Sequence, residues 1–378
     1  MAALGAMATL ARWLGPWGAR GVPRGVVRTS TMLEAAHGGD RERVRTPLRV
    51  DTYRRERGAP VGAYLVVPGL HYLGPEDPRF DRFARILASA GFVVVAPFLP
   101  DHLALRIAPG AADDLAIAFE HTESITKREA LPAPAIFSIS FGSLPAIALA
   151  ASDAYRARVG ALVLFGGYAD FDAAVRFALT GRAHDGDDEA RAIAMAHDPL
   201  NAPVVWLYLL PHLAVACDKA AVARAWRTMV ERTWGREEMK RADARRVVAD
   251  DVANGLGDTE RALFLSGCGL RDFDRAASDA AFRACAKDVA FADARPHLER
   301  VTAPVVVIHG KDDDVIPWLE ADKIRAALAM GRARHTVLVT GMYGHTGASL
   351  PSPRALAREL RTMLDVVSSI ASAATGEL

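Results

Sequence analysis

Three side chains that together could carry out nucleophilic catalysis, a serine, an aspartate and a histidine, each follow a short apolar run in this chain. Ser140 follows the run 135–139 and has small residues two positions before and after it, Ser138 and Gly142. This spacing is typical of a sharp strand-to-helix turn that exposes a serine in a strained backbone conformation. The side chains at these two flanking positions are expected to face each other. The neighbouring serines have a larger residue two positions before them, so Ser140 is the predicted nucleophile.

The acid of this group is expected beyond the apolar run 304–310. Asp313 lies three residues after that run. In an open parallel sheet, catalytic groups gather at the carboxyl ends of the strands, so a carboxylate here could reach a histidine placed after the next strand. The adjacent Asp312 and Asp314 are expected to be solvated carboxylates that stabilise the turn.

The base is expected after the following apolar run, 335–340. His345 has glycines on both sides, at positions 344 and 347. Flanking glycines suit a loop that presents an imidazole rather than burying it. The position after the next strand is also where a base could meet Ser140 and Asp313 together.

Short apolar runs alternate with helical patterns of ten or more residues over much of the chain. This alternation predicts an α/β fold with a mostly parallel sheet flanked by helices on both faces. Asp77 is expected to cap one helix, with Pro78 in its first turn. The predicted strands are 62–68, 92–97, 135–139, 160–166, 304–310 and 335–340.

The alternation stops between 168 and 300, where only helical periodicity is found. This stretch predicts an all-helical cap inserted between two strands of the sheet. The predicted division is therefore a leader at 1–42, a first core segment at 43–167, the cap at 168–300 and a second core segment at 301–378. The cap is expected to shape the substrate pocket.

The first 33 residues contain arginines and no acidic residue. Such a stretch is typical of a mitochondrial transit peptide, or of an amphipathic segment that contacts a membrane surface through Trp13 and Trp17. A disordered leader on a cytoplasmic protein is the simpler interpretation. The sequence contains no uninterrupted apolar stretch of about 18 residues, so it predicts no membrane-spanning helix.

The composition narrows the class of protein. Forty-six basic and 45 acidic residues give a net charge of +1, which does not indicate a nucleic-acid partner. The three cysteines lack metal-ligand spacing and favour a reducing compartment. No histidine, cysteine or carboxylate cluster indicates a metal site, and no glycine-rich phosphate loop indicates a cofactor. The oligomeric state is left open.

The order Ser140, Asp313, His345 along the chain resembles that of the α/β-hydrolase superfamily. The resemblance extends over about 45–167 and 302–372, and leaves the helical insertion unmatched. One departure from the pattern is a serine, rather than a glycine, two positions before the nucleophile.

Within the superfamily, two further motifs resemble those of esterases, lipases and dienelactone-hydrolase-like members. They are Pro68–His71, after one predicted strand, and Pro97–Pro100, after the next. The resemblance implies a serine hydrolase with no cofactor that acts on a small-molecule acyl substrate.

The resemblance also implies a role for each residue. Ser140 would attack the acyl carbonyl, His345 would accept and return its proton, and Asp313 would orient the imidazole. The backbone N–H groups of Leu70 and Phe141 would form the oxyanion hole.

Other histidines compete for roles at the site. His71 and His102 could line the pocket or form structural hydrogen bonds, whereas His309 is expected to be a packed core residue. The expected reaction is hydrolysis of a carboxylic ester, or of a related thioester or amide. The alternatives are acyl transfer by the same residues and a non-catalytic binding protein of this fold.

Overall fold

The computed structural model describes residues 2–14, 21–34, 47–184, 191–272, 274–341 and 353–378. These residues divide into two compact units. The first comprises the chain up to Asp170 together with 294–313 and 318–378, and the second comprises 171–293 together with 314–317. The sequence predicted the insertion at 168–300.

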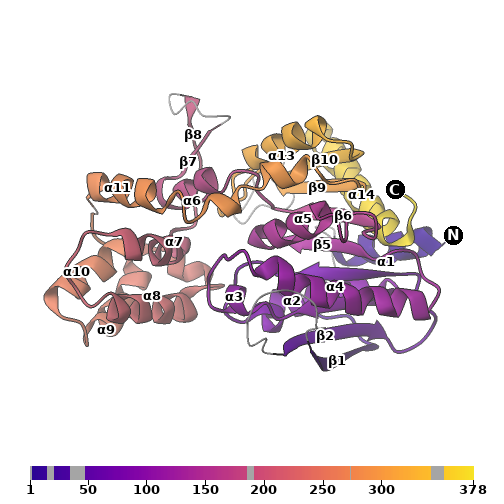
Figure 1. The fold of residues 1–378 in the computed structure, drawn as a ribbon, viewed down its shortest axis with the longest axis horizontal. Coiled ribbons are helices and arrows are strands. Elements are labelled where there is room, and N and C mark those ends of the chain that lie inside the picture. Colours follow the sequence, from indigo (N-terminus) through magenta and orange to yellow (C-terminus); the bar gives the residue numbers. More distant parts are fainter. Residues whose placement is uncertain (1, 15–20, 35–46, 185–190, 273, 342–352) are drawn as a thin grey trace. The chain divides into compact units, whose positions relative to one another are not determined.

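The first unit is built on an eight-stranded sheet with the order β1-β2-β4-β3-β5-β6-β9-β10 (Figure 1). The six strands from β4 to β10 run parallel, while β2 is antiparallel to both β4 and β1. The mostly parallel sheet predicted from the sequence is therefore confirmed. The strands are β1 (Val26–Leu33), β2 (Leu48–Arg55), β3 (Gly62–Val67), β4 (Phe92–Pro97), β5 (Ala135–Ile139), β6 (Ala161–Phe165), β9 (Val305–Gly310) and β10 (His335–Thr340).

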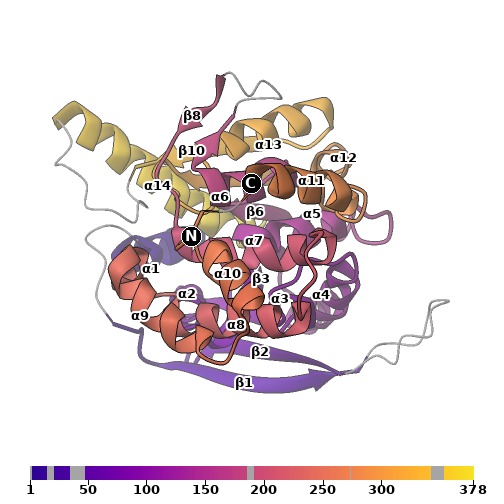
Figure 2. The same ribbon diagram turned by 90° about the vertical axis from the view of Figure 1, so that its left-hand side faces the viewer.

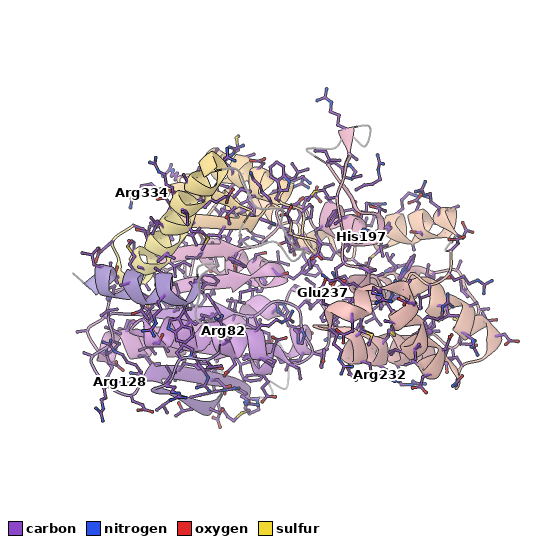
Figure 3. The ribbon with its side chains drawn as sticks, turned by 180° about the vertical axis from the view of Figure 1, so that it is seen from behind. Arg82, Arg128, His197, Arg232, Glu237 and Arg334 are labelled. Atoms are coloured by element: carbon purple, nitrogen blue, oxygen red, sulfur yellow. The ribbon has the colours of Figure 1, made fainter. Side chains whose placement is uncertain are left out.

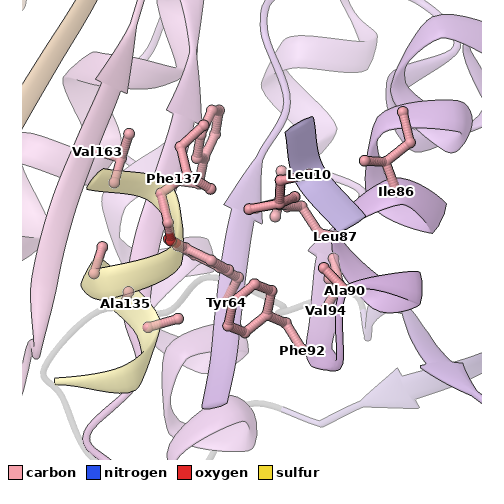
Figure 4. Close-up of a cluster of buried hydrophobic side chains, with 14 of the residues drawn as sticks. Leu10, Tyr64, Ile86, Leu87, Ala90, Phe92, Val94, Ala135, Phe137 and Val163 are labelled. Atoms are coloured by element: carbon pink, nitrogen blue, oxygen red, sulfur yellow. The ribbon is translucent and has the colours of Figure 1, made fainter. Parts of the chain in front are cut away.

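The central strands are buried on both faces, because they are continuous apolar runs rich in valine and isoleucine. Alternate residues of β3, β4, β5, β6 and β9 belong to one hydrophobic cluster, which also contains side chains of α1, α2 and α14. Figure 4 shows part of this cluster, with Tyr64 and Phe137 between α14 and the helices that carry Leu10 and Leu87. The Tyr64 hydroxyl donates a hydrogen bond to the carbonyl oxygen of Ile370 in α14.

The helices of this unit follow the predicted alternation. Helix α2 begins after Asp77, whose carboxylate accepts a hydrogen bond from the backbone N–H of Arg79 at 2.8 Å. This is the predicted cap, with Pro78 as the first helical residue. The helices are α1 (Ala2–Leu14), α2 (Pro78–Ser89), α3 (Pro100–Leu103), α4 (Ala111–Arg128), α5 (Ser143–Ala151), α12 (Arg295–Leu298), α13 (Leu319–Met330) and α14 (Pro353–Thr375), with single 3₁₀ turns at Gly74–Glu76 and Ser140–Gly142.

The N-terminal region differs from the predicted disordered leader. Helix α1 buries Ala3, Ala6 and Leu10 in the core cluster, and β1 pairs with β2 along the edge of the sheet (Figure 2). The Nε of Arg28, in β1, donates to the buried carboxylate of Asp51 at 2.7 Å. These segments form part of the core because their apolar and charged side chains find partners distant in the sequence.

The second unit is mainly helical, as predicted, with one small addition. Two-residue strands, β7 (Arg182–Ala183) and β8 (Ile193–Ala194), form an antiparallel pair separate from the main sheet. The helices are α6 (Phe171–Thr180), α7 (Ala202–Leu209), α8 (Lys219–Thr233), α9 (Ala242–Ala253), α10 (Asp258–Gly267) and α11 (Arg275–Cys285), with 3₁₀ turns at Pro199–Asn201, Leu210–His212, Glu237–Lys240 and Ala290–Ala292.

The second unit has a core of its own around Trp226. This side chain is fully buried, and its Nε1 donates to the carbonyl oxygen of Phe264 at 3.1 Å. A Cβ at Gly267 would lie 2.4 Å from the indole ring, so the absence of a side chain there lets α8 and α10 approach closely. Among the residues that the structure describes, no helix is long and apolar enough to cross a membrane.

Candidate active site

The predicted nucleophile lies at a strand-to-helix turn. Ile139 ends β5 in an extended conformation, and a 3₁₀ turn over Ser140–Gly142 leads into α5. Ser140 has a φ of +51°, a left-handed conformation that a residue with a Cβ rarely adopts. Such strain costs on the order of 1–3 kcal/mol and persists only where the surrounding structure fixes it. This is the backbone conformation that the sequence predicted for a nucleophile turn.

The carboxyl end of β3 limits the size of the residue two positions after Ser140. A Cβ at Gly142 would lie 2.5 Å from the carbonyl oxygen of Pro68 and 3.0 Å from that of Val67. A side chain at this position would therefore displace backbone rather than a flexible neighbour. Position 142 therefore requires a glycine because the backbone at the end of β3 lies so close to it. The sequence had instead led us to expect that the residue at position 138 would exclude a side chain here.

The side chain of Ser138 contacts β6 rather than β3. Its side chain is fully buried, and its Oγ donates a weak hydrogen bond to the carbonyl oxygen of Val163 in β6, at 3.4 Å. The hydroxyl is thus accommodated between β5 and β6. This contact explains how the turn accepts a serine where the resemblance leads one to expect glycine.

The turn after β3 lies against the predicted nucleophile. A Cβ built on Gly69 would be 3.3 Å from the carbonyl oxygen of Ile139 and 3.4 Å from the Cβ of Ser140. Leu70, whose N–H is a predicted oxyanion donor, is the next residue. The described structure therefore brings the segment that carries one predicted donor into contact with the residue it would serve.

Phe141, the residue whose N–H is the second predicted donor, packs on the other side of the turn. Its ring lies 5.3 Å from the ring of Tyr168, which is fully buried beyond the end of β6. The backbone N–H of Tyr168 is in turn 3.5 Å from the Oγ of Ser143, at the start of α5. These contacts fix the start of α5 relative to the end of β6.

His102 lies in α3, beyond β4, with its side chain almost completely buried. Its Nδ1 is 3.2 Å from the carbonyl oxygen of Pro68. Burial lowers the pKa of His102 to about 4, although hydrogen bonds with the backbone of Pro68 and Gly69 oppose the shift. The imidazole is therefore neutral at neutral pH, and the structure assigns it a hydrogen bond to the turn.

His71 is also held by structural contacts. Its Nδ1 accepts from the backbone N–H of Leu73 at 3.2 Å, and its Nε2 lies 3.2 Å from the carboxylate of Asp77. Burial lowers its pKa, while the nearby carboxylate opposes that shift. His71 thus has a structural hydrogen bond, which is one of the two roles considered for it from the sequence.

Asp313 lies beyond the end of β9 and remains partly exposed, at 22% of its side chain. A Cβ on Gly166, which follows β6 with a φ of +59°, would lie 3.2 Å from its Oδ2. The same oxygen is 3.7 Å from the Nε2 of His309, which is fully buried in β9. His309 is therefore packed in the core, as predicted, and it also lies close to the predicted acid.

The neighbouring aspartates behave differently from one another. Asp312 is exposed, as predicted, but Asp314 is buried. In the second unit, the Nζ of Lys240 donates to the Oδ2 of Asp314 at 2.8 Å, and the backbone N–H of Asp198 donates to its carbonyl oxygen at 2.7 Å. The expected solvated carboxylate is wrong for Asp314, because a lysine distant in the sequence neutralises its charge.

His345 lies outside the described residues. The last described residues before it are Thr340 and Gly341, and both are held by Glu359 in α14. Its Oε2 accepts from the Thr340 hydroxyl at 2.8 Å and from the Gly341 N–H at 3.0 Å. The strand that precedes the predicted base is thereby fixed at its carboxyl end.

The role of one supporting residue, Glu320, was not predicted from the sequence. Glu320 in α13 is buried, and its Oε2 accepts from the backbone N–H groups of Ala169 and Asp170 at 2.9 and 2.8 Å. Lys323 completes the group with a contact of 2.7 Å to its Oε1. The only available signal was an acid in the first turn of an expected helix, which does not distinguish a buried clamp from a surface carboxylate.

Among the described residues, no group of three or more histidine, cysteine, aspartate or glutamate side chains could hold a metal ion. The three cysteines are not joined in disulfides. Cys268 is buried, and burial raises the pKa of its thiol to about 12. This thiol is therefore not a nucleophile in the described structure.

No family model and no curated protein matches the sequence. Among solved structures, a bacterial brefeldin A esterase, described as a homologue of human hormone sensitive lipase, aligns with a TM-score of 0.47 and 13% identity over 99% of this chain and 86% of its own. A structure from an analysis of two fungal esterases from Rhizomucor miehei gives a TM-score of 0.44 at 11% identity, over 93% of this chain and 86% of its own. An acylaminoacyl peptidase from Pyrococcus horikoshii gives 0.44 at 12% over 92% of this chain and 41% of its own.

The strand order and the strained strand-to-helix turn at Ser140 agree with the α/β-hydrolase fold that the sequence predicted. The similarities to solved structures are too distant to indicate a substrate.

Proposed function

We propose that this protein is a serine hydrolase that cleaves a carboxylic ester, or a related thioester or amide, through an acyl-enzyme intermediate. The observation that carries the proposal is the left-handed backbone of Ser140, at +51°, in a turn with no room for a side chain at Gly142. A strained backbone conformation of this kind destabilises the fold. In serine hydrolases it exposes the nucleophilic serine at the carboxyl end of a central parallel strand.

The first half of the proposed reaction uses Ser140, His345 and Asp313. The serine Oγ would attack the acyl carbonyl while His345 takes its proton, and Asp313 would stabilise the resulting imidazolium. Collapse of the tetrahedral intermediate breaks the bond to the leaving group, which departs as an alcohol with the proton from His345. In the second half, water would attack the acyl-enzyme by the same route and release the acid and free Ser140.

The proposed oxyanion hole consists of the backbone N–H groups of Leu70 and Phe141. Support comes from the closeness of Gly69 to Ser140, since a Cβ built on Gly69 would lie 3.4 Å from the Cβ of Ser140 and Leu70 is the next residue. Loss of one such donor typically lowers kcat by about 100- to 1000-fold.

A fluorophosphonate probe tests the proposal because it reacts covalently with an activated serine. We expect wild-type protein to be labelled, and Ser140→Ala, His345→Ala and Asp313→Asn to lose most or all labelling. Ser152→Ala is the matched control, since Ser152 lies just beyond α5 and its hydroxyl bonds only the carbonyl of Leu149 among the described residues. Labelling of folded Ser140→Ala at the wild-type rate would refute the assignment of the nucleophile.

Turnover of p-nitrophenyl esters of increasing acyl length then measures the chemistry itself. Release of free acid is expected in water, and the product distribution with added alcohols reports how well an alcohol competes with water for the acyl-enzyme. Labelling without any ester turnover would contradict hydrolysis while leaving Ser140 as a reactive residue.

A further inference from the structure

The neutral, buried imidazole of His102 lies directly behind the turn that contacts Ser140. Its Nδ1 is 3.2 Å from the carbonyl oxygen of Pro68. A carbonyl oxygen can only accept, so Nδ1 carries the hydrogen and donates. The neutral ring therefore has an unprotonated Nε2.

That second ring nitrogen has no hydrogen-bond partner among the described residues, and the side chain is only 1% exposed. A buried acceptor without a donor costs on the order of 1–3 kcal/mol. An apolar residue would fill α3 without this cost, so packing alone does not account for an imidazole here. The features that remain are the hydrogen bonds of the ring with the backbone of Pro68 and Gly69, the first of them at 3.2 Å.

The Pro68 carbonyl is confined from two directions. On one side it accepts from His102, and on the other it lies 2.5 Å from the position that a Cβ on Gly142 would occupy. The next residue, Gly69, lies so near Ser140 that a Cβ built on it would be 3.4 Å from the Cβ of Ser140. Rotation of this peptide group would move the Leu70 N–H, which belongs to the next peptide unit along the chain.

We propose that His102 is a positioning residue for the oxyanion hole: its Nδ1–H holds the Pro68 carbonyl and thereby orients the Leu70 N–H toward the carbonyl oxygen that Ser140 attacks. This inference rests on the proposed hydrolase function. It assigns His102 a role in transition-state stabilisation, not in proton transfer. The charged group next to it in sequence, Asp101, is paired with Arg106 and does not accept from the ring in the described structure.

The inference is tested with two substitutions that separate the donor from the shape of the ring. His102→Asn retains an N–H donor near the position of Nδ1, whereas His102→Leu fills similar space without one. The readouts are kcat and KM for p-nitrophenyl butyrate and the inhibition constant of a short alkyl trifluoromethyl ketone, which forms a tetrahedral oxyanion with an active serine.

For His102→Leu we expect kcat to fall and the inhibition constant to rise by the same factor, about 10- to 100-fold. This is smaller than the roughly 100- to 1000-fold loss of kcat that follows complete removal of an oxyanion donor, because the Leu70 N–H is misoriented rather than removed. The KM should change by no more than about threefold, because the ground-state carbonyl depends less on the donor. His102→Asn should restore both quantities to within about fivefold of wild type. A merely structural histidine would lower the melting temperature of both variants without this split between kcat and KM.

If His102→Leu retains the wild-type kcat and inhibition constant, the inference is wrong while the proposed function stands. If wild-type protein neither hydrolyses the ester nor reacts with a fluorophosphonate, the proposed function fails first. Should His102→Leu not fold, His102→Gln provides the test, since its amide places a donor near Nε2 instead. It is expected to lose activity as His102→Leu would, and wild-type activity in His102→Gln would overturn the inference.

Discussion

Lowering the pH should weaken the folded state more in wild-type protein than in a His102→Asn variant. Burial lowers the pKa of His102 in the folded state to about 4, from an ordinary value of 6.5. The unfolded chain therefore binds a proton more readily than the folded one at any pH between these two values. By linkage, stability from the neutral ring is fully present above pH 6.5 and is lost as the pH falls toward 4.

The expected size of this effect follows from the shift. A difference of about 2.5 pKa units corresponds to about 3 kcal/mol once the pH is below both values, and to about 2 kcal/mol at pH 5. The ring is almost completely buried, so solvent screening reduces this figure little. Asparagine does not titrate, so the variant should lack this component of the pH dependence.

The assay is urea unfolding of both proteins at pH 7.5 and pH 5.0, followed by far-ultraviolet circular dichroism. Other groups with lowered pKa values, such as Asp77, Glu123 and His71, also titrate in this range or below it, but they are common to both proteins. The quantity of interest is the change in free energy of unfolding between the two pH values. The reasoning is refuted if that change is equal in wild type and variant.

Further substitutions test other contacts, each by thermal or urea unfolding. Gly142→Ala should cost about 1–3 kcal/mol and slow fluorophosphonate labelling, because its Cβ would meet backbone at 2.5 Å; unchanged stability and labelling would contradict the tight turn. Lys240→Met should lower the free energy of unfolding by about 3 kcal/mol, because it leaves the buried carboxylate of Asp314 without this lysine. Arg232→Met is the control: Arg232, on α8 (Figure 3), belongs to an exposed ion pair, so its loss should cost less than about 1 kcal/mol. Equal costs would refute the distinction between buried and exposed ion pairs. Glu320→Leu should cost about 2–4 kcal/mol by removing the acceptor of two backbone N–H groups, and a cost below about 1 kcal/mol would show that the clamp is dispensable.

The core strands and the strained turn at Ser140 could be predicted from the sequence because their signals are local. A continuous apolar run, a serine with small neighbours and a following helical pattern all lie within 135–151. The capping role of Asp77 is equally local, since its carboxylate bonds a residue two positions away. Such features depend on steric rules that operate over a few residues.

Other features depend on partners far along the chain. Asp312 and Asp314 stand in the same run of three aspartates, yet only Asp314 is buried, because Lys240 lies 74 residues away in sequence. Helix α1 resembles a leader by composition and becomes part of the core by packing against α2 and against α14, at the other end of the chain. No local pattern reports such pairings.

The reason for the glycine at position 142 could not be derived from the turn alone. The sequence correctly indicated a small residue, but the atoms that exclude a side chain belong to β3, not to the turn itself. For the same reason, the hydrogen bond of His102 to Pro68 could not be distinguished in advance from a role in lining a pocket.

The junction of the first unit with the helical segment has a consequence for how this chain can change. The backbone N–H of Ala294 donates to the carbonyl oxygen of Ala169 at 2.9 Å, and Glu320 holds the same short stretch from α13. The two ends of the helical segment 171–293 are thus held together by a hydrogen bond between the residues that flank it. A segment with its ends fixed together can lengthen, shorten or be exchanged with only a slow, logarithmic change in closure entropy. The helical segment is therefore a place where sequence can diverge while the strand ends that carry Ser140 and Asp313 keep their spacing.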